Sequence, residues 1–496
     1  MSEIMVVSNR ASMGTLPLRF ISPDQEHLRI LLLKASRKAS QYRRNIVVCL
    51  IQPIEHLNPI DVFAFLQQCA PGDSFFWAQP SAQTAFVGCG CVAKIETRGA
   101  TRFSAAATAW HTLLEHAVID GVPSDIQARF PFIFGGFSFD AQRPTTSLWE
   151  GFPQGLFILP QLLLLQDGDQ ALLAISMLVQ PDDDIELHHR EIQAVLDRLQ
   201  VTLEDYHRDE PEIDLSQCMT IRDLRAVGEW KKLVGRVGRQ IQEGIYEKVV
   251  LARGVNVTLD ARTGATFDVS KVLRRLAQSY PSSYVFAIQR GKLCFTGATP
   301  ECLVRIRDSQ LYTMALAGTA PRGTNALEDE QIGAALLSSG KNQKEHHSVV
   351  SMLQETLQRF CHQVCIGDQQ QLTKLQNVQH LMTSITGELL NGYSIMEIVA
   401  RLHPTPAVGG LPSQAALQVI REQEELDRGW YASPIGWIDA DGDGEFAVAL
   451  RSGLIHGREA TLFAGCGIVA GSDPQSEYLE SCLKLKAMLR GLGYEN

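Results

Sequence analysis

Short apolar runs bounded by turn residues dominate the first part of the chain. Residues 46–51, 156–165 and 171–179 are such runs, and their length and composition predict β-strands. The sequence Gln-Asp-Gly-Asp-Gln at 166–170 separates the last two runs, so residues 156–179 are predicted to form one β-hairpin. Antiparallel sheet is therefore expected in this part of the chain.

A polar and acidic stretch at residues 204–216 interrupts this pattern and is typical of an exposed connection. We therefore divide the chain into an N-terminal β-rich region (1–205), a polar connection (206–225) and a second region (226–496). Both regions are expected to belong to the same fold.

The second region opens with a helical pattern at residues 221–244, followed by a short apolar strand at 248–253 that ends in a basic residue. A later helix is predicted from a core-facing stripe with alternating spacings of three and four residues. The stripe consists of Val350, Leu353, Leu357, Phe360 and Val364.

The end of the chain has the pattern of a meander. Apolar runs at 437–438, 446–455 and 460–464 are joined by polar turns, and a helix is predicted over 474–490. Because strands follow one another and seldom alternate with helices, the pattern predicts an α+β fold around antiparallel sheets and not a doubly wound parallel fold.

Composition narrows the class of protein. The 496 residues include 45 Lys and Arg against 55 Asp and Glu, a net charge of −10 that argues against broad binding to nucleic acid or an anionic membrane. No stretch approaches the roughly 18 apolar residues that span a bilayer, and the N-terminus lacks the apolar core of a signal peptide. The 11 scattered cysteines fit reduced thiols. We expect a cytoplasmic protein in which local features attract any anionic ligand.

Two motif matches are discounted on their context. The segment Gly-Cys-Gly at 465–467 follows a strand and precedes a helix, but no second strand follows, as a dinucleotide-binding fingerprint requires. Its glycines instead suggest a close approach of the backbone to another segment or to an anionic group. The acidic segment 439–444 resembles the start of a calcium loop, but Leu450 stands where that loop needs a glutamate, so a hairpin turn is predicted.

Charged side chains gather on the last predicted helix. With Asp473 as its N-cap, Glu477 and Glu480 fall on one face and Lys484 lies one turn further. An exposed helix with an i,i+4 ion pair accounts for this pattern, and so do carboxylates that bind Mg²⁺ and leave sites for water and substrate. Glu345 is a candidate for an opposing carboxylate, although an acidic residue near a helix N-terminus is favourable by itself.

Four more polar residues are candidates for a site. Lys248 begins an apolar strand, where it either reaches the surface or is desolvated enough to act as a base. Glu301 follows a strand and a proline that stiffens the turn, so its carboxyl either faces a ligand or belongs only to the turn. His380 and His403 each admit a structural role. These residues alone indicate an enzyme-like second half and no particular substrate.

The order of motifs in the second half adds a family resemblance. The motifs are Lys-Val-Val-Leu-Ala-Arg at 248–253, Gly-Ala-Thr-Pro-Glu at 297–301, Ala-Leu-Ala-Gly-Thr at 315–319, Lys-Glu-His at 344–346, His-Pro-Thr-Pro-Ala-Val-Gly-Gly at 403–410, Gly-Trp at 436–437, the run at 446–451, and Ala-Gly-Cys-Gly-Ile-Val at 464–469 before Ser476 and Glu477. In this order they resemble the chorismate-utilising enzymes, and among these the isochorismate synthases. The first region matches only loosely, chiefly at 134–140.

The resemblance implies a fold and a ligand set. The expected fold stacks antiparallel sheets at the centre with helices outside, as in anthranilate synthase component I, with residues 226–496 as the catalytic region. The expected ligands are the dianion chorismate and Mg²⁺, the metal held by Glu345 and Glu480 with Glu477 close by. The positions that match the family's substrate site are Gly318, Thr319, His380, His403, Ala407, Arg451, Gly465, Gly467 and Lys484.

The resemblance also implies a reaction. Lys248, uncharged when it acts, takes a proton from water that attacks C2 of chorismate, and protonated Glu301 donates to the departing C4 hydroxyl, which yields isochorismate. Relatives that use ammonia typically carry Gln at the position of Lys248, and aminodeoxychorismate synthases carry Lys at that of Ala317. No glutamine amidotransferase subunit is therefore expected, and the chain is expected to be a monomer or weak homodimer.

Two alternatives stay open at this point. A salicylate synthase would also eliminate pyruvate from isochorismate, although Ala407 and its loop look more like enzymes that stop at isochorismate. A non-catalytic relative would keep the fold alone. The product could serve menaquinone, phylloquinone or siderophore synthesis, since each pathway presents the site with the same substrate.

Overall fold

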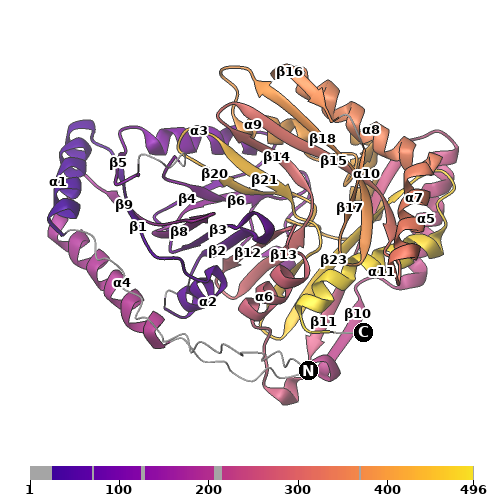
Figure 1. Ribbon diagram of the computed structural model, residues 1–496, viewed down its shortest axis with the longest axis horizontal. Coiled ribbons are helices and arrows are strands. Elements are labelled where there is room, and N and C mark those ends of the chain that lie inside the picture. Colours follow the sequence, from indigo (N-terminus) through magenta and orange to yellow (C-terminus); the bar gives the residue numbers. More distant parts are fainter. Residues whose placement is uncertain (1–24, 70–71, 124–128, 206–214, 368–369, 495–496) are drawn as a thin grey trace, which may run out of the picture.

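Two large β-sheets packed face to face form the centre of the molecule, and helices lie outside them (Figure 1). The computed structural model describes residues 25–69, 72–123, 129–205, 215–367 and 370–494. Aromatic side chains join the inner faces of the sheets. Phe75 and Phe134, one from each sheet, stack with ring centroids 3.6 Å apart.

The first sheet has 13 strands, and its neighbours pair antiparallel except for β1 and β5, which are parallel. Along the sheet the order is β10 (Met219–Asp223), β11 (Lys248–Leu259), β23 (Glu459–Ile468), β22 (Ser452–His456), β13 (Leu293–Thr299), β12 (Tyr284–Arg290), β2 (Ser74–Gln79), β3 (Thr84–Cys89), β8 (Leu162–Asp167), β9 (Gln170–Val179), β1 (Ile46–Pro53) and β5 (Val118–Asp120), with β19 (Gly410–Leu411) on β11.

The second sheet has 10 strands and is antiparallel throughout its described pairs. Its order is β16 (Cys361–Ile366), β18 (Val378–Leu389), β15 (Gln310–Pro321), β14 (Cys302–Arg307), β21 (Gly444–Val448), β20 (Pro434–Ile438), β6 (Ile133–Phe137), β7 (Gly155–Leu159) and β4 (Ala93–Thr97), with β17 (Gln371–Lys374) on β18. Both sheets thus contain strands from residues 1–205 and from residues 226–496.

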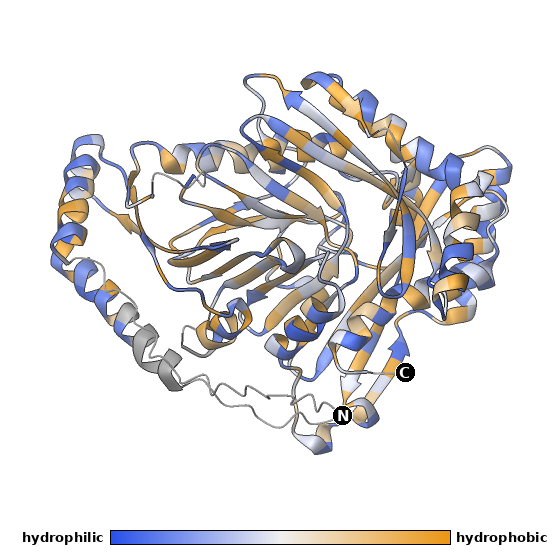
Figure 2. Ribbon diagram, in the orientation of Figure 1, coloured by the Kyte–Doolittle hydropathy of each residue, from blue (hydrophilic) through white to orange (hydrophobic). Residues whose placement is uncertain are grey.

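The outer helices are amphipathic, as the alternating colours of Figure 2 show. In α6, for example, Asp268 caps the N-terminus by accepting from the N–H of Ser270, while Val272, Leu273 and Leu276 are buried against the sheet. The helices are α1 (Gln25–Tyr42), α2 (Pro59–Cys69), α3 (Arg102–Leu114), α4 (Ile185–Asp205), α5 (Val227–Gln242), α6 (Val269–Ser279), α7 (Ala326–Ser338), α8 (Gly340–Leu357), α9 (Ile395–Leu402), α10 (Ser413–Gln423) and α11 (Pro474–Gly491). None of these described helices has the length and apolar character needed to cross a membrane.

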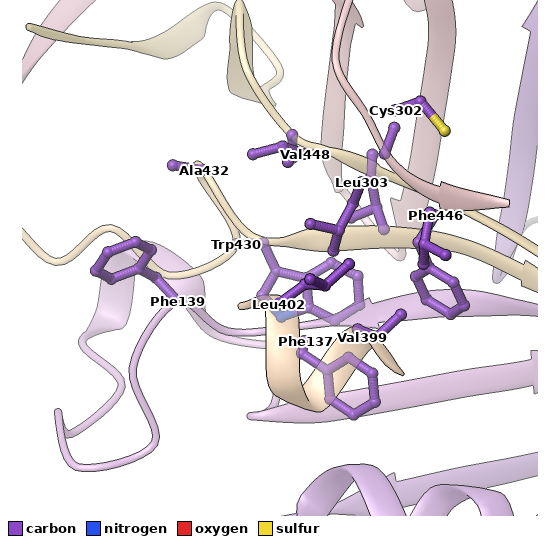
Figure 3. Close-up of a cluster of buried hydrophobic side chains, with 14 of the residues drawn as sticks. Phe137, Phe139, Cys302, Leu303, Val399, Leu402, Trp430, Ala432, Phe446 and Val448 are labelled. Atoms are coloured by element: carbon purple, nitrogen blue, oxygen red, sulfur yellow. The ribbon is translucent and has the colours of Figure 1, made fainter. Parts of the chain in front are cut away.

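One part of the core lies next to the segment that leads into β20 (Figure 3). Phe137 from the first region packs there with Trp430 and Phe446 from the second, and all three side chains are almost completely buried. Burying such large aromatic groups contributes strongly to stability, so this cluster fixes the two regions of sequence against each other.

Two predicted strands are wrong because each is divided between the sheets. The run 156–165 breaks at Pro160, so β7 lies in the second sheet and β8 in the first, and the predicted hairpin consists of β8 and β9 alone. The run 446–455 likewise divides into β21 and β22. An apolar run buried on both faces gives no sign of where the chain changes sheets.

Two predicted helices have wrong limits. The segment predicted as a helix from 221 starts as strand β10, which pairs with β11, and α5 begins only at Val227. The helix predicted through Val364 is shorter than expected, because α8 ends at Leu357 and Val364 lies in β16. Leu353 and Leu357 do face the core.

The remaining predictions agree with the structure more closely. The runs 46–51 and 248–253 lie in β1 and β11, the segment 474–490 forms α11, and 439–444 is the turn between β20 and β21. Antiparallel sheets with outer helices are confirmed as the fold class. The division of the chain at 206–225 stays a prediction: β10 falls inside that stretch, and residues 206–214 lie outside the described residues.

Candidate active site

A cavity of about 220 Å³ opens where the chain twice passes between the sheets. One passage is the Pro300–Glu301 link from β13 to β14, and the other is the Ala449–Arg451 link from β21 to β22. The two links are joined by hydrogen bonds from the N–H of Val448 to the Glu301 carbonyl (3.0 Å) and from the N–H of Ala298 to the Arg451 carbonyl (3.2 Å). Glu301 and Arg451 are thereby fixed side by side in the cavity wall.

Most of the predicted site residues meet around this cavity. The wall includes Glu301, Gly318, Thr319, Glu345, His380, Ala407, Arg451, Gly465, Gly467, Glu477, Glu480 and Lys484. They come from β15, β18, β23, α8, α11 and the links between strands. Spacing in the sequence, by contrast, separates Glu301 from Lys484 by most of the second region.

Lys248 lies immediately behind the wall. Its side chain is buried at the start of β11, 5% of the residue being exposed, and its Nζ lies 2.7 Å from Oε1 of Glu345. Of the two interpretations of Lys248, the structure rules out the one in which it reaches the surface, and its amino group instead contacts Glu345.

The structure does not bring His403 to the cavity. Its Nε2 lies 3.0 Å from the carbonyl oxygen of Phe139, and the ring packs against the Phe139 side chain. Burial, together with the charge of Arg102, lowers the pKa of His403 to about 3, so the ring is neutral and Nε2 carries the donated proton. The structural role considered for this histidine fits its surroundings better than contact with a ligand.

Helix α11 presents its acidic face to the cavity and not to solvent. Asp473 caps it by accepting from the N–H of Ser476 (2.8 Å), and Lys484 pairs with Glu480 (2.7 Å) while donating to the Gly465 carbonyl (3.0 Å). Burial alone would lower the pKa of Lys484, but Glu480 and its neighbours raise it, so the ammonium stays charged. The predicted i,i+4 ion pair therefore forms inside the site.

The carboxylates that line the cavity suit a hard divalent cation. Ligand atoms of Glu477, Glu480 and Cys466 lie within 4.8 Å of one another, and Glu345 lines the same cavity. Carboxylate oxygens are the donors that Mg²⁺ prefers, whereas a thiol is a poor ligand for it, and the Cys466 thiol instead donates to the Glu477 carbonyl. The three predicted metal residues thus fit Mg²⁺, although Glu345 is here paired with Lys248 and outside the closer group.

His380 orients Arg451. An Nη2 hydrogen of Arg451 is donated to Nε2 of His380 (2.8 Å), so the ring proton is on Nδ1, which lies 3.2 Å from the Gly318 carbonyl and 3.1 Å from Oγ1 of Thr319. Burial and the charges of Arg451 and Lys484 lower the pKa of His380 well below its ordinary value. A bulge in β15 at Gly318, where φ is +77°, presents this carbonyl.

Glu301 keeps its proton to a higher pH than an ordinary carboxyl does. Burial is the main cause and raises the pKa of the carboxyl to about 7, while Lys248, Arg451 and Lys484 act in the opposite direction. Arg451 stays cationic near neutral pH, since burial lowers its pKa only to about 10. The cavity therefore contains a carboxylic acid that can donate a proton beside two cations that can hold carboxylates.

The glycines of β23 make room for their neighbours. Gly465 and Gly467 belong to strand β23, which pairs with β11, so this segment lies within a strand and does not follow one. A Cβ at Gly467 would lie 2.6 Å from Cε of Lys248, and one at Gly465 would lie 3.2 Å from the Tyr431 hydroxyl. The close approach predicted for these glycines is thus to side chains of the chain itself.

Tyr431 and Arg428 line the cavity and were missed from the sequence. Both lie in the Asp-Arg-Gly-Trp-Tyr-Ala segment at 427–432, which carries no helical or strand period. Burial raises the pKa of Tyr431, which keeps its hydroxyl protonated. A charged residue next to aromatic and small residues was the available signal.

The chain is similar to known proteins over most of its length. The family model described as chorismate binding enzyme matches residues 33–493. The isochorismate synthase MenF of Bacillus subtilis is 36% identical over 96% of this chain and 99% of its own length, and the salicylate biosynthesis isochorismate synthase of Pseudomonas aeruginosa is 36% identical over 92% and 93%. Among solved structures, the menaquinone-specific isochorismate synthase MenF of Escherichia coli superposes with a TM-score of 0.72 at 25% identity, covering 93% of this chain and all of that one.

Proposed function

The chain belongs to the chorismate-binding enzyme family, and we propose that, as an isochorismate synthase, it interconverts chorismate and isochorismate with water as the nucleophile. The observation that carries the mechanism is the pairing, around one cavity, of a buried lysine behind the wall with a buried carboxylic acid in it. Acid and base on the same substrate are what exchange of a hydroxyl group requires.

The cations of the cavity are assigned to the carboxylates of chorismate. Arg451 is held in place by His380, and Lys484 by Glu480 and the Gly465 carbonyl. Tyr431 adds a hydroxyl donor to the same wall. Charged donors in a buried site bind carboxylates strongly, which explains how an acidic protein of net charge −10 attracts a dianion.

We assign Glu345, Glu477 and Glu480 as the residues that hold Mg²⁺. When bound, Mg²⁺ would supply positive charge that offsets these carboxylates and attracts the ring carboxylate of the substrate. Glu345 pairs with Lys248 in this structure. A Glu345 that holds the metal would release the Lys248 amine for its part as the base.

Lys248 and Glu301 exchange protons with the reactants during the proposed reaction. Neutral Lys248 takes a proton from the water that forms a bond to C2, the ring double bonds shift, and the C4–O bond breaks as Glu301 donates its proton to the departing hydroxyl, which leaves as water. Lys248 ends as an ammonium and Glu301 as a carboxylate, so the reverse reaction uses the same two groups with their roles exchanged.

Ala317 lines the cavity where an aminodeoxychorismate synthase carries a lysine. No side-chain nucleophile is therefore available at that position, which supports water as the attacking group. The proposal includes no glutamine amidotransferase partner, because no ammonia is consumed.

Product analysis tests the proposal. Purified protein incubated with chorismate and Mg²⁺ is expected to give a mixture of isochorismate and chorismate, identified by chromatography, and the same mixture when started from isochorismate. Chelation of the metal with EDTA should stop the reaction and re-addition of Mg²⁺ should restore it. Salicylate with an equal amount of pyruvate would instead indicate a salicylate synthase, and unchanged chorismate in the presence of Mg²⁺ would refute both.

Gly467→Ala is expected to slow the reaction without unfolding the protein. The new Cβ would lie 2.6 Å from Cε of Lys248, the far end of a flexible side chain, so the lysine must move. A displacement of about 1 Å of a reacting group costs up to roughly 10²-fold in rate. We expect kcat to fall by about that factor, and the Tm measured by calorimetry to change little.

Gly228→Ala, at a helix position where a Cβ meets nothing within 4 Å, is the matched control and should keep wild-type kcat. Wild-type kcat in Gly467→Ala would show that the position of Lys248 does not limit the reaction.

A further inference from the structure

One edge of β11 is incomplete beside the cavity. β19 pairs with Lys248 and Val249, the N–H of Val250 still reaches the Gly409 carbonyl (3.0 Å), and β10 pairs with the strand only from Val255 onward. Between them the carbonyl of Val250 and the N–H of Ala252 face no strand of the described residues. Buried backbone groups of this kind must find other partners.

A buried ion pair closes this gap. Arg428 donates from Nη2 to the Val250 carbonyl (2.7 Å), and Glu424 accepts from the N–H of Ala252 (2.8 Å). The two side chains bind each other through Nε and Oε1 (2.7 Å) and through Nη2 and Oε2 (2.5 Å), and they are 3% and 0% exposed. The pair thus replaces one step of a β-ladder with side-chain groups.

Arg428 also binds the opposite side of the gap. Its Nη1 donates to the carbonyl of Val408 (2.9 Å), which lies in the 403–410 loop, and its guanidinium lies 4.3 Å from the centre of the Phe139 ring. Figure 3 shows Phe139 beside the segment that carries Trp430 and Ala432. A single guanidinium therefore connects β11, the 403–410 loop and the segment that brings Tyr431 to the cavity.

We propose that Arg428, held by Glu424, is a positioning residue that fixes the 403–410 loop and the segment carrying Tyr431 against β11 at the point where the pairing with β19 ends. The inference rests on the proposed function, since it assigns this arrangement to the reaction of Lys248 and its substrate. We call Arg428 and Glu424, with the backbone groups they bind, the clamp. The cavity wall includes Val250, Val408 and Arg428, so a shift of the clamp moves the wall itself.

The chemistry of arginine explains why this position needs it. The planar guanidinium offers donors in a fixed fork, so it satisfies Glu424, Val250 and Val408 at once, whereas the ammonium of lysine is a single point with a flexible stem. Burial alone would lower the pKa of Arg428, but Glu424 raises it, and the residue stays charged.

Arg428→Lys tests the proposal. We expect kcat of the folded protein to fall by about 10- to 100-fold, with a much smaller change in KM and with Mg²⁺ binding by calorimetry unchanged, because Arg428 contacts none of the proposed metal ligands. The matched control is Arg421→Lys, which alters the ion pair of Arg421 with Asp140 (Nη2 to Oδ1, 2.9 Å) and lies outside the cavity wall. It should keep wild-type kcat.

A second readout does not depend on activity. Amide hydrogen exchange in the ligand-free protein should be faster at 249–253 and 404–410 in Arg428→Lys than in the wild type, and unchanged there in Arg421→Lys. Should Arg428→Lys not fold, Glu424→Gln, which keeps an acceptor for Ala252, is expected to show the same changes in smaller measure.

The outcomes separate the two proposals. Wild-type protein that leaves chorismate unchanged counts against the proposed function, while the exchange rates still test the clamp. A folded variant with wild-type kcat, or one whose exchange in both segments equals that of the wild type, overturns the positioning role of Arg428.

Discussion

Lys248→Gln is expected to lower kcat for isochorismate formation by about 10²- to 10⁴-fold, the usual contribution of a general base. Glutamine is one atom shorter than lysine and keeps an amide N–H that can donate towards Glu345, but it takes up no proton from water. Nζ of the buried Lys248 lies 2.7 Å from Glu345, whereas the lysine in the described cavity wall, Lys484, is paired with Glu480 and stays charged. Steady-state kinetics in both directions measures the effect.

The same variant is expected to bind Mg²⁺ at least as tightly as the wild type. Lys248 competes for the Glu345 carboxylate through a charge-assisted ion pair, and the neutral amide competes less. Calorimetric titration with Mg²⁺ alone measures this without turnover. A loss of binding would instead indicate that the substitution disturbs the acidic wall as a whole.

The control is Lys374→Gln, which removes a lysine paired with Asp329 at 2.9 Å, away from the cavity. It should match the wild type in both kcat and Mg²⁺ affinity. More than a tenth of wild-type kcat in Lys248→Gln would rule out this lysine as the base.

The sequence predicted the class of fold but not the path of the chain through it. Runs such as 46–51 are strands because they are apolar and bounded by turn residues. The runs 156–165 and 446–455 satisfy the same rule, and yet each passes from one sheet to the other. The sequence does not show this change because the side chains on both faces of these strands are buried. The local pattern of apolar residues therefore cannot tell which of the two sheets a strand joins.

The site depends on those same changes of sheet. Glu301 and Arg451 lie in the links between the two sheets. The order of the motifs indicated the chemistry of these two residues, but no local feature of the sequence indicated that they lie close together. The family resemblance is confirmed by the comparisons, and it named twelve residues of the cavity wall. Arg428 escaped prediction because two of its partners are backbone carbonyls of distant segments, which have no signature in a sequence.

Glu301→Gln is expected to change activity and stability in opposite directions. The amide has no acidic proton for the departing hydroxyl, so kcat should fall by about 10²- to 10⁴-fold. The wild type needs this carboxyl protonated. Its kcat/KM should therefore decline as pH rises through about 7, the pKa of Glu301, and the residual activity of the variant should lack this decline.

Stability follows from the same shift. Burial raises the pKa of Glu301 from 4.5 to about 7, so between these values the native state holds a proton that the unfolded state has released. The free energy of unfolding of the wild type therefore falls as pH rises from 4.5 to 7, by up to about 3 kcal/mol for this group. Glutamine does not titrate, so the stability of the variant lacks this decline. Denaturant unfolding should show that the free energy of unfolding of the variant, relative to that of the wild type, rises between pH 4.5 and 7 and stays higher above pH 7.

Glu445→Gln separates the catalytic part of this expectation from the general cost of a buried carboxyl. Burial also raises the pKa of Glu445, which accepts a hydrogen bond from the Tyr284 hydroxyl at 2.8 Å in the core, outside the cavity wall. Its replacement should gain stability with pH in the same direction and keep wild-type kcat. If Glu301→Gln retained most of its kcat while showing the stability gain, Glu301 would be a buried acid without a part in the reaction, and the proton for the C4 hydroxyl would have to come from another group of the wall.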